Sequence, residues 1–137
     1  MPQLQPVSVP DAPEGSHYSV AEVQAMQRAV IKLFERWGLS DEQAVVLLGN
    51  IATRTYQRWK VGSYGRAGVD LSARLSNLLG IHKALRLLFK DARRGYGWLR
   101  RGNAAFGGKS ALDIMLGGQL TDLMRVRRYL DAQRAPW

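Results

Sequence analysis

The sequence predicts an all-α fold, built either as one ordinary domain or as two very small domains that share a core. Apolar residues recur at steps of three and four along several stretches, which is the period of an amphipathic helix. Residues that cap helix N-termini precede these stretches, and glycines follow them. No stretch alternates apolar and polar residues as a half-buried strand does. The length of 137 residues suits a fold of this size.

Residues 1–18 are predicted to form a flexible leader. The stretch has no hydrophobic periodicity, and it lacks the basic and apolar regions of a signal peptide. Its prolines are Pro2, Pro6, Pro10 and Pro13.

The first helix is expected to begin after Ser19. Ser19 and Glu22 form the S-x-x-E pattern of a capping box, and Gly38 has the character of a residue that ends a helix. The apolar stripe between them consists of Val20, Val23, Met26, Val30, Phe34 and Trp37.

Two shorter helices should follow. Ser40 and Asp41 are expected to cap the second helix, which ends at Gly49. Thr53 is expected to cap the third, which runs to about Val61 and ends at Gly62.

The rest of the chain also shows a helical pattern, interrupted by glycines. Asp70 or Ser72 is available to cap a helix from Leu71 to about Arg94, which Gly80 could interrupt. Ser110 is expected to cap a short helix over 111–116, and a last helix should span 121–133. The buried side of this last helix would hold Leu120, Leu123, Met124, Tyr129 and Leu130.

Composition excludes several classes of function. The chain has no Cys, so disulfides, thiolate zinc sites and Cys nucleophiles are excluded. With only His17 and His82, a His-rich metal site or a Ser-His-Asp triad is not expected. No apolar run approaches the ~20 residues that a membrane-spanning helix needs. We therefore expect a cytoplasmic binding protein that is not an enzyme and uses no cofactor.

The positive charge is concentrated in the middle of the chain. The formal net charge is +9, and residues 43–112 contain thirteen Lys or Arg against two Asp. Such a concentration is typical of a surface that binds a polyanion such as nucleic acid. Two alternatives remain open, namely solvated Arg side chains on helix exteriors and an acidic protein partner.

The segment LSDEQAVVLLGNIATRTYQRWKVG has the pattern of a helix-turn-helix, whose second helix can enter a major groove. At ~100° per residue, Ala52, Tyr56 and Trp59 would face inward, while Arg54, Gln57 and Arg58 face outward and Thr55 lies on the flank. Arg can read guanine and Gln can read adenine. The candidate DNA-binding residues are Thr53, Arg54, Thr55, Gln57, Arg58 and Lys60. For Thr53 the alternative is a capping role alone, and Lys60 suits a phosphate contact better than a base contact.

Both halves of the chain resemble a known family. The segment TRTYQRWKVG is similar to the recognition helix of Xre-type regulators. The C-terminal half, from Trp98-Leu99 through NAAFGGKSALDIM to the final helix, resembles the toxin-binding domain of Xre/MbcA/ParS antitoxins, although Ala111 stands where relatives have Pro. Asn103, Phe106, Gly107, Gly108, Ser110 and Leu112 match the family signature.

This resemblance implies an antitoxin with a leader over 1–18, a helix-turn-helix domain over 19–80 and a toxin-binding domain over 81–137. Its partners would be a RES-domain toxin that degrades NAD and the operator DNA of its own operon, which a homodimer would repress in a bacterial cytoplasm. The expected toxin-binding residues are Phe106, Arg128, Tyr129, Arg134 and Trp137.

Plainer interpretations remain beside the resemblance. The protein could be a stand-alone transcriptional regulator whose C-terminal half only dimerises, or a non-specific nucleic-acid-binding protein. Gly107 and Gly108 could serve only to turn the chain with positive φ before a capped helix. Asn103 could likewise serve only to satisfy backbone groups of the loop.

Overall fold

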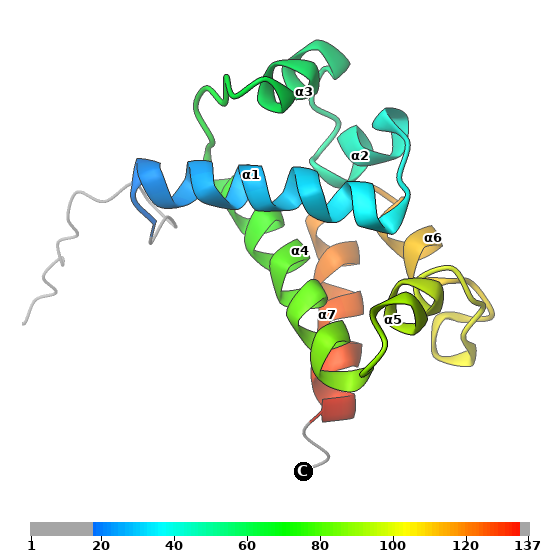
Figure 1. The fold of residues 1–137 in the computed structure, drawn as a ribbon. Helices are drawn as coiled ribbons and strands as arrows, with labels where there is room; N and C mark the ends of the chain where they lie inside the picture. The colour runs from blue at the N-terminus through cyan, green and yellow to red at the C-terminus, as the bar shows by residue number, and fades with distance from the viewer. Residues whose placement is uncertain (1–17, 135–137) are drawn as a thin grey trace, which may run out of the picture.

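The computed structural model describes residues 18–134. Residues 1–17 of the predicted leader lie outside this range, and so does Trp137. Within that range the chain forms seven α-helices, one 3₁₀ turn and no strand (Figure 1). The prediction of an all-α fold is confirmed. The elements are α1 (Val20–Trp37), α2 (Asp41–Leu47), α3 (Thr53–Lys60), α4 (Val69–Leu88), α5 (Ala92–Trp98), η1 (Ala104–Phe106), α6 (Ala111–Met115) and α7 (Leu120–Arg134).

Helix α1 crosses the upper end of the α4–α7 pair and carries α2 and α3 on its other side (Figure 1). Its predicted limits are confirmed. The Ser19 hydroxyl accepts from the Glu22 amide, the Glu22 side chain accepts from the Ser19 amide, and Gly38 ends the helix with φ +71°. The inward side of α1 is fully buried at Val30 and Phe34.

Ser40 is confirmed as the cap of α2, where Asp41 is the first helical residue, whereas the predicted start of α3 is wrong in one detail. Ser40 and Gln43 form a complete capping box at α2. Thr53 does not cap α3, because it is itself the first helical residue, and Ala52 occupies the cap position with no side-chain bond. Ala52 is exposed rather than inward-facing, because it precedes the first turn of the helix.

Helix α4 begins earlier than predicted and is not broken. Gly68 occupies its cap position, so neither Asp70 nor Ser72 caps it. Gly80 lies inside the helix, where a single glycine costs only ~1 kcal/mol relative to Ala. The side chain of Arg127 from α7 lies against it, since a Cβ built on Gly80 would be 2.6 Å from Arg127 Nε.

The segment that follows α4 departs from the prediction of one helix reaching Arg94. Helix α4 ends at Leu88, Phe89 takes an extended conformation, and Asp91 caps the separate helix α5 by accepting from the Arg93 amide. The glycines of this region therefore lie inside a helix, not between helices: Gly95 and Gly97 both belong to α5.

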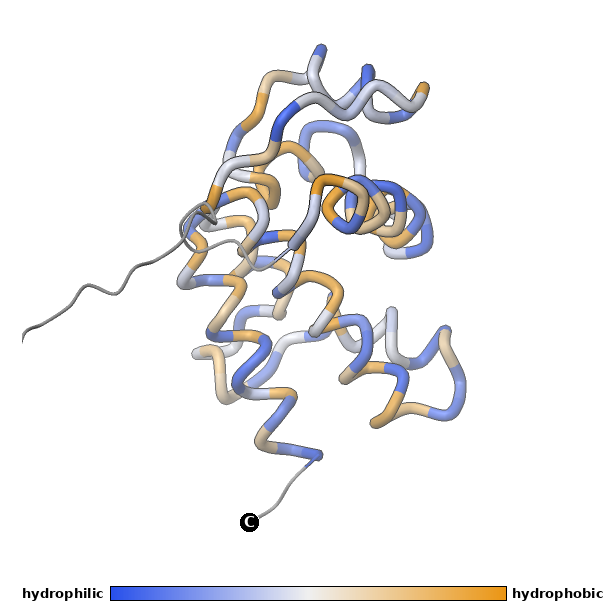
Figure 2. Tube along the Cα trace, turned by 90° about the vertical axis from the view of Figure 1, so that its left-hand side faces the viewer, coloured by the Kyte–Doolittle hydropathy of each residue, from blue (hydrophilic) through white to orange (hydrophobic). Residues whose placement is uncertain are grey.

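The core runs continuously through both halves of the chain. Helices α4 and α7 pack side by side along their lengths. Leu75, Leu78 and Ile81 of α4 and Leu123 and Val126 of α7 are all fully buried. Figure 2 shows the expected alternation of hydrophobic and hydrophilic residues around the turns of these helices.

The short helix α6 and the long helix α7 agree with the prediction within one residue at each end. Ser110 and Asp113 form a third complete capping box. Among the described residues, no helix combines the length and apolar character that crossing a membrane requires.

Candidate functional site

An aromatic cluster fixes α3 on α1. The ring of Phe34 lies 6.5 Å from that of Tyr56, and the rings of Tyr56 and Trp59 lie 6.2 Å apart in an edge-on arrangement. Tyr56 is 2% exposed and Trp59 is 1% exposed, so the prediction that both belong to the core is confirmed. Burial, together with the negative charges of Asp41 and Glu35, raises the pKa of Tyr56 to about 12.

Arg74 of α4 packs against the turn between α2 and α3. The Arg74 guanidinium donates to the carbonyl oxygen of Leu47 at 3.3 Å and to Asp70 Oδ2 at 2.7 Å. Gly49 passes close over this group with φ +91°, and a Cβ there would lie 3.0 Å from Arg74 Nε. Arg74 is 6% exposed, so a buried charged side chain holds the C-terminal end of α2.

The outer face of α3 carries the predicted DNA-binding side chains. Arg54, Gln57 and Arg58 are all exposed, as the helical period predicted, and Thr55 is half-buried on the flank. Thr53 is exposed at the start of the helix. Whether these side chains contact DNA stays a prediction. Helix α3 and the last turn of α7 lie at opposite ends of the molecule (Figure 1).

Asp41 of α2 contacts two of these candidate DNA-binding residues, Gln57 and Lys60. The sequence did not predict these contacts. Gln57 Nε2 donates to Asp41 Oδ2 at 2.6 Å, and Lys60 Nζ lies 2.6 Å from Asp41 Oδ1. Lys60 also lies over the Tyr56 ring, 5.1 Å from its centroid. The only available signal was that Gln57 and Lys60 lie three residues apart, on one side of α3.

The loop before α6 is shaped by the residues that match the family signature. The Asn103 side chain accepts from the Ala105 amide at 2.9 Å, and the Asn103 carbonyl accepts from Gly108. Gly107 and Gly108 have φ of +66° and +88°. Gly102 lies so close to Gly108 that an added Cβ would be 2.7 Å from its carbonyl oxygen. The predicted roles of Asn103 and the two glycines in loop geometry are confirmed.

Three aromatic rings join this loop to α7. Trp98 stacks on Tyr129 with centroids 6.0 Å apart, and Phe106 contacts Tyr129 edge-on at 5.2 Å. Arg125 lies over Phe106, with Cζ 5.3 Å from the ring centroid. We call Trp98, Phe106 and Tyr129 the aromatic cluster of the C-terminal half. Trp98 and Arg125 were not among the predicted toxin-binding residues, although Arg125 and Tyr129 lie four residues apart on one face of α7.

The predicted toxin-binding residues have different environments. Phe106 is buried and Tyr129 is half-buried within the aromatic cluster. Arg128 is exposed, and Arg134 is exposed with its guanidinium 3.8 Å from Asp131. Their contacts with a toxin stay a prediction. Over residues 18–134, no group of three or more His, Asp or Glu side chains could hold a metal ion.

Comparison with known proteins finds a matching domain family for each half of the chain. Residues 18–80 match the antitoxin Xre-like helix-turn-helix domain. Residues 84–135 match the antitoxin Xre/MbcA/ParS C-terminal toxin-binding domain. Over 114 residues the chain is 45% identical to the uncharacterized protein y4oB of Sinorhizobium fredii (strain NBRC 101917 / NGR234), covering 83% of this chain and 88% of that protein.

The chain belongs to the Xre/MbcA/ParS antitoxin family. A helix-turn-helix domain implies DNA as one partner, and a toxin-binding domain implies a cognate toxin as the other. Both domains act by binding, so the protein is not an enzyme.

Proposed function

We propose that this antitoxin neutralises a RES-domain toxin that degrades NAD, and that it represses its own operon through α3. The observation that carries the proposal is the separation of two surfaces. The exposed basic face of α3 and the C-terminal end of α7 lie at opposite ends of the molecule (Figure 1). One antitoxin can therefore offer different surfaces to DNA and to toxin.

On the toxin side, inhibition would be steric. Arg128 and Arg134 are exposed on α7, which leads directly to residues 135–137. Arg and aromatic side chains are the usual anchors of protein interfaces, where truncation of one can cost ≥2 kcal/mol. We propose that these residues and Trp137 cover the cleft in which the toxin binds NAD.

Phe106 and Tyr129 would act at the same interface by holding its shape. Phe106 is 3% exposed, so it supports the surface of α7 rather than offering its own ring. Tyr129 is half-buried, which leaves part of its side chain at the surface.

On the DNA side, α3 would lie in the major groove. Arg54 and Arg58 would read guanine, and Gln57 would read adenine. Thr53, Thr55 and Lys60 would contact phosphates, which fix the register of the helix on the duplex. A homodimer would place two such helices about one helical turn (~34 Å) apart on a two-fold operator.

The second candidate is a stand-alone transcriptional regulator whose C-terminal half dimerises. The core shared by α4 and α7 gives the C-terminal half a structural role, which this alternative also requires. The two candidates differ in one respect, because only the antitoxin forms a stable complex with a second protein.

Purification from the native host separates them. The protein would carry an N-terminal tag, leaving Trp137 free, and would be isolated with its own upstream DNA present or absent. We expect a stoichiometric RES-domain partner that only denaturant releases. Removal of residues 135–137 should weaken rescue of toxin-expressing cells while leaving the thermal unfolding midpoint unchanged. Specific retention of the upstream DNA without a protein partner would instead identify a simple repressor.

A further inference from the structure

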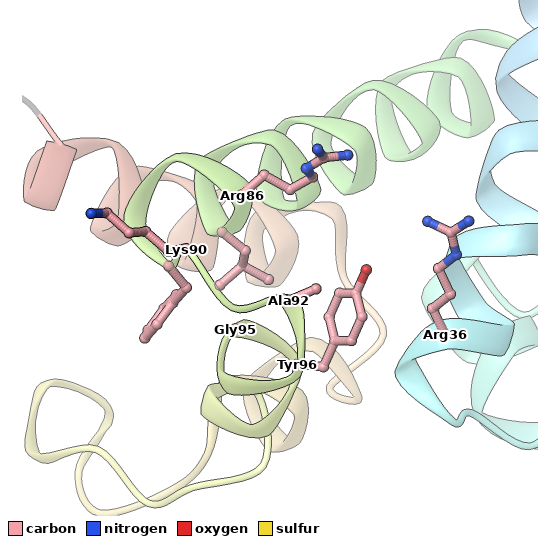
Figure 3. A pocket seen from close by; sticks show the side chains of 8 residues that line it. Arg36, Arg86, Lys90, Ala92, Gly95 and Tyr96 are labelled. Carbon is pink, nitrogen blue, oxygen red and sulfur yellow. The ribbon is translucent and has the colours of Figure 1, made fainter.

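A cavity of about 270 Å³ lies where the C-terminal end of α1 meets α4 and α5. Its walls come from both halves of the chain: Arg36 from α1, Arg86 from α4, Tyr96 from α5, and Lys90 from the connection between α4 and α5 (Figure 3). No residue of α3 lines it, so it is separate from the DNA-binding surface.

The polar lining of this cavity is cationic. Arg36, Arg86 and Lys90 line it, and no Asp or Glu of the described residues does. None of these three has an ion pair within residues 18–134. Among the described residues, the Lys and Arg side chains that do have an ion pair are Lys60, Arg74, Arg127 and Arg134. Arg36 and Arg86 therefore present their charges to the cavity without a carboxylate, whereas the Lys90 ammonium points away from them (Figure 3).

The pKa of His82 responds to the positive charge of this cavity. It lies on α4 in the neighbouring hollow, together with Lys32 and Arg36 of α1. Burial lowers the pKa of His82, and the charges of Arg86 and Arg36 lower it further. Two of the cavity's three cations therefore act on one titratable group, and no described acid offsets them there.

The rest of the lining suits a flat organic group. Leu85 is buried, and the half-buried ring of Phe89 lies beside it. The Tyr96 ring stands between the α4 side of the cavity and Arg36, with its hydroxyl directed toward the space between Arg36 and Arg86 (Figure 3). This hydroxyl can donate to an anion that both guanidiniums also contact.

We infer that this cavity binds a small organic phosphate of mononucleotide size. Arg36 and Arg86 would hold the phosphate, because guanidinium groups form paired, charge-assisted hydrogen bonds with phosphate oxygens. Phe89 and Tyr96 would contact the base or sugar. A volume of about 270 Å³ lies just below the usual range of ligand pockets, ~300–1,000 Å³, which suits a mononucleotide better than a dinucleotide. The ligand would connect the helix-turn-helix half, through Arg36, to the toxin-binding half, through Arg86.

The inference can be tested on the full chain by NMR titration with AMP, with adenosine as the probe that lacks phosphate. We expect saturable shifts of amides around Arg86 and Tyr96 with AMP and none with adenosine. Arg36→Gln and Arg86→Gln should each weaken AMP about tenfold or more, as the loss of a charge-assisted hydrogen bond does. Arg101→Gln removes the same charge from an exposed side chain outside the cavity and should leave AMP affinity unchanged.

His82 gives an independent readout of the same event. A bound phosphate offsets the charges of Arg36 and Arg86, so AMP should raise the pKa of His82, with Lys32 left as the remaining cation that faces it. The inference is overturned if AMP causes no saturable shifts up to about 10 mM. It is also overturned if adenosine binds as well as AMP, or if Arg101→Gln weakens AMP as much as Arg86→Gln does.

Discussion

Asp41 accepts a hydrogen bond from Gln57 across the helix-turn-helix, with Gln57 Nε2 2.6 Å from Asp41 Oδ2. This bond fixes which end of the amide faces α2, so Gln57 Oε1 and the second N–H of Nε2 remain for another partner. Those two groups are what a glutamine needs to read adenine, which it contacts through N6 and N7. Asp41 is therefore a positioning residue for the proposed base reader.

Asp41→Asn should reduce discrimination at one base position without unfolding the protein. Asn can keep one of the two contacts but loses the charge that holds both Gln57 and Lys60. The exposed ion pair with Lys60 contributes only about 0–1 kcal/mol to stability. Competition binding with operators changed one base pair at a time would measure the effect.

Glu42→Gln is the matched control for Asp41→Asn, because it removes an exposed acid next to Asp41 on the same helix. Both variants should bind all DNA somewhat more tightly, since each removes a charge that repels phosphate. Only Asp41→Asn should lose discrimination at the base position that Gln57 reads. Equal preference in the two variants would mean that Asp41 does not orient Gln57.

Arg54 and Arg58 should behave differently from basic residues outside α3. Arg54→Ala and Arg58→Ala should each cost about 1–3 kcal/mol on operator DNA and relax sequence preference, as loss of a bidentate base contact does. Arg93→Ala, on α5 and outside the α3 surface, should change operator and scrambled DNA binding equally, and by less than Arg54→Ala or Arg58→Ala does. Fluorescence anisotropy at several salt concentrations distinguishes the two classes, and identical behaviour of all three variants would contradict the assignment of α3.

Two glycines of the helix-turn-helix have the same backbone φ but different surroundings. Comparing their Ala variants therefore distinguishes the cost of backbone strain from the cost of steric crowding by a neighbouring side chain. Gly49 and Gly62 both have φ +91°, yet Gly49 lies against Arg74 and Gly62 has no atom within 4 Å of an added Cβ. Gly62→Ala should cost about 1–2 kcal/mol from the left-handed backbone alone. Gly49→Ala should cost about 1–3 kcal/mol more, because the buried Arg74 has to move.

Urea unfolding of the Gly49→Ala and Gly62→Ala proteins measures this difference directly. Gly49→Ala should also weaken operator binding, because Arg74 holds the carbonyl of Leu47 at the end of α2. Equal free energies of unfolding would show that Arg74 adapts at no cost.

Variants of Phe106 and Arg128 test whether two residues of the proposed toxin-binding surface have different roles. Phe106 would support the surface from within the protein, and Arg128 would contact the toxin. Phe106→Ala should cost about 3–5 kcal/mol of stability, because it empties a buried site beneath Tyr129. Arg128→Ala should change stability by less than about 0.5 kcal/mol, yet weaken toxin binding. Calorimetric titration with the toxin and thermal unfolding would be measured on both proteins. Gln133→Ala, also exposed on α7, is the control that should change neither.

The parts of the fold that the sequence predicted are those set by local interactions. The capping boxes at Ser19, Ser40 and Ser110 each involve residues three positions apart, so they are visible as short patterns. The continuity of α4 past Gly80 was not visible, because it depends on packing against α7 and Arg127. The end of α4 at Leu88 was also missed, since apolar periodicity continues through Phe89.

The candidate site shows the same division. The helical period alone predicted that Arg54, Gln57 and Arg58 face outward on α3. The Gln57–Asp41 bond joins residues 16 positions apart, and it required the angle between α2 and α3 to be known. The cationic cavity of Arg36, Arg86 and Lys90 combines three separate segments, none of which is distinctive alone.

Tyr56 should make stability fall in alkaline solution. Its pKa is raised from 10.0 to about 12 in the native protein, so between these values the unfolded chain releases a proton that the native chain keeps. The free energy of unfolding therefore falls as pH rises through this range, by about 2–3 kcal/mol in all. Tyr56→Phe has no such proton, and its decline should be shallower. Urea unfolding of both proteins from about pH 9 to 11 measures this, and parallel curves would show that Asp41, Glu35 and burial do not hold the proton on Tyr56.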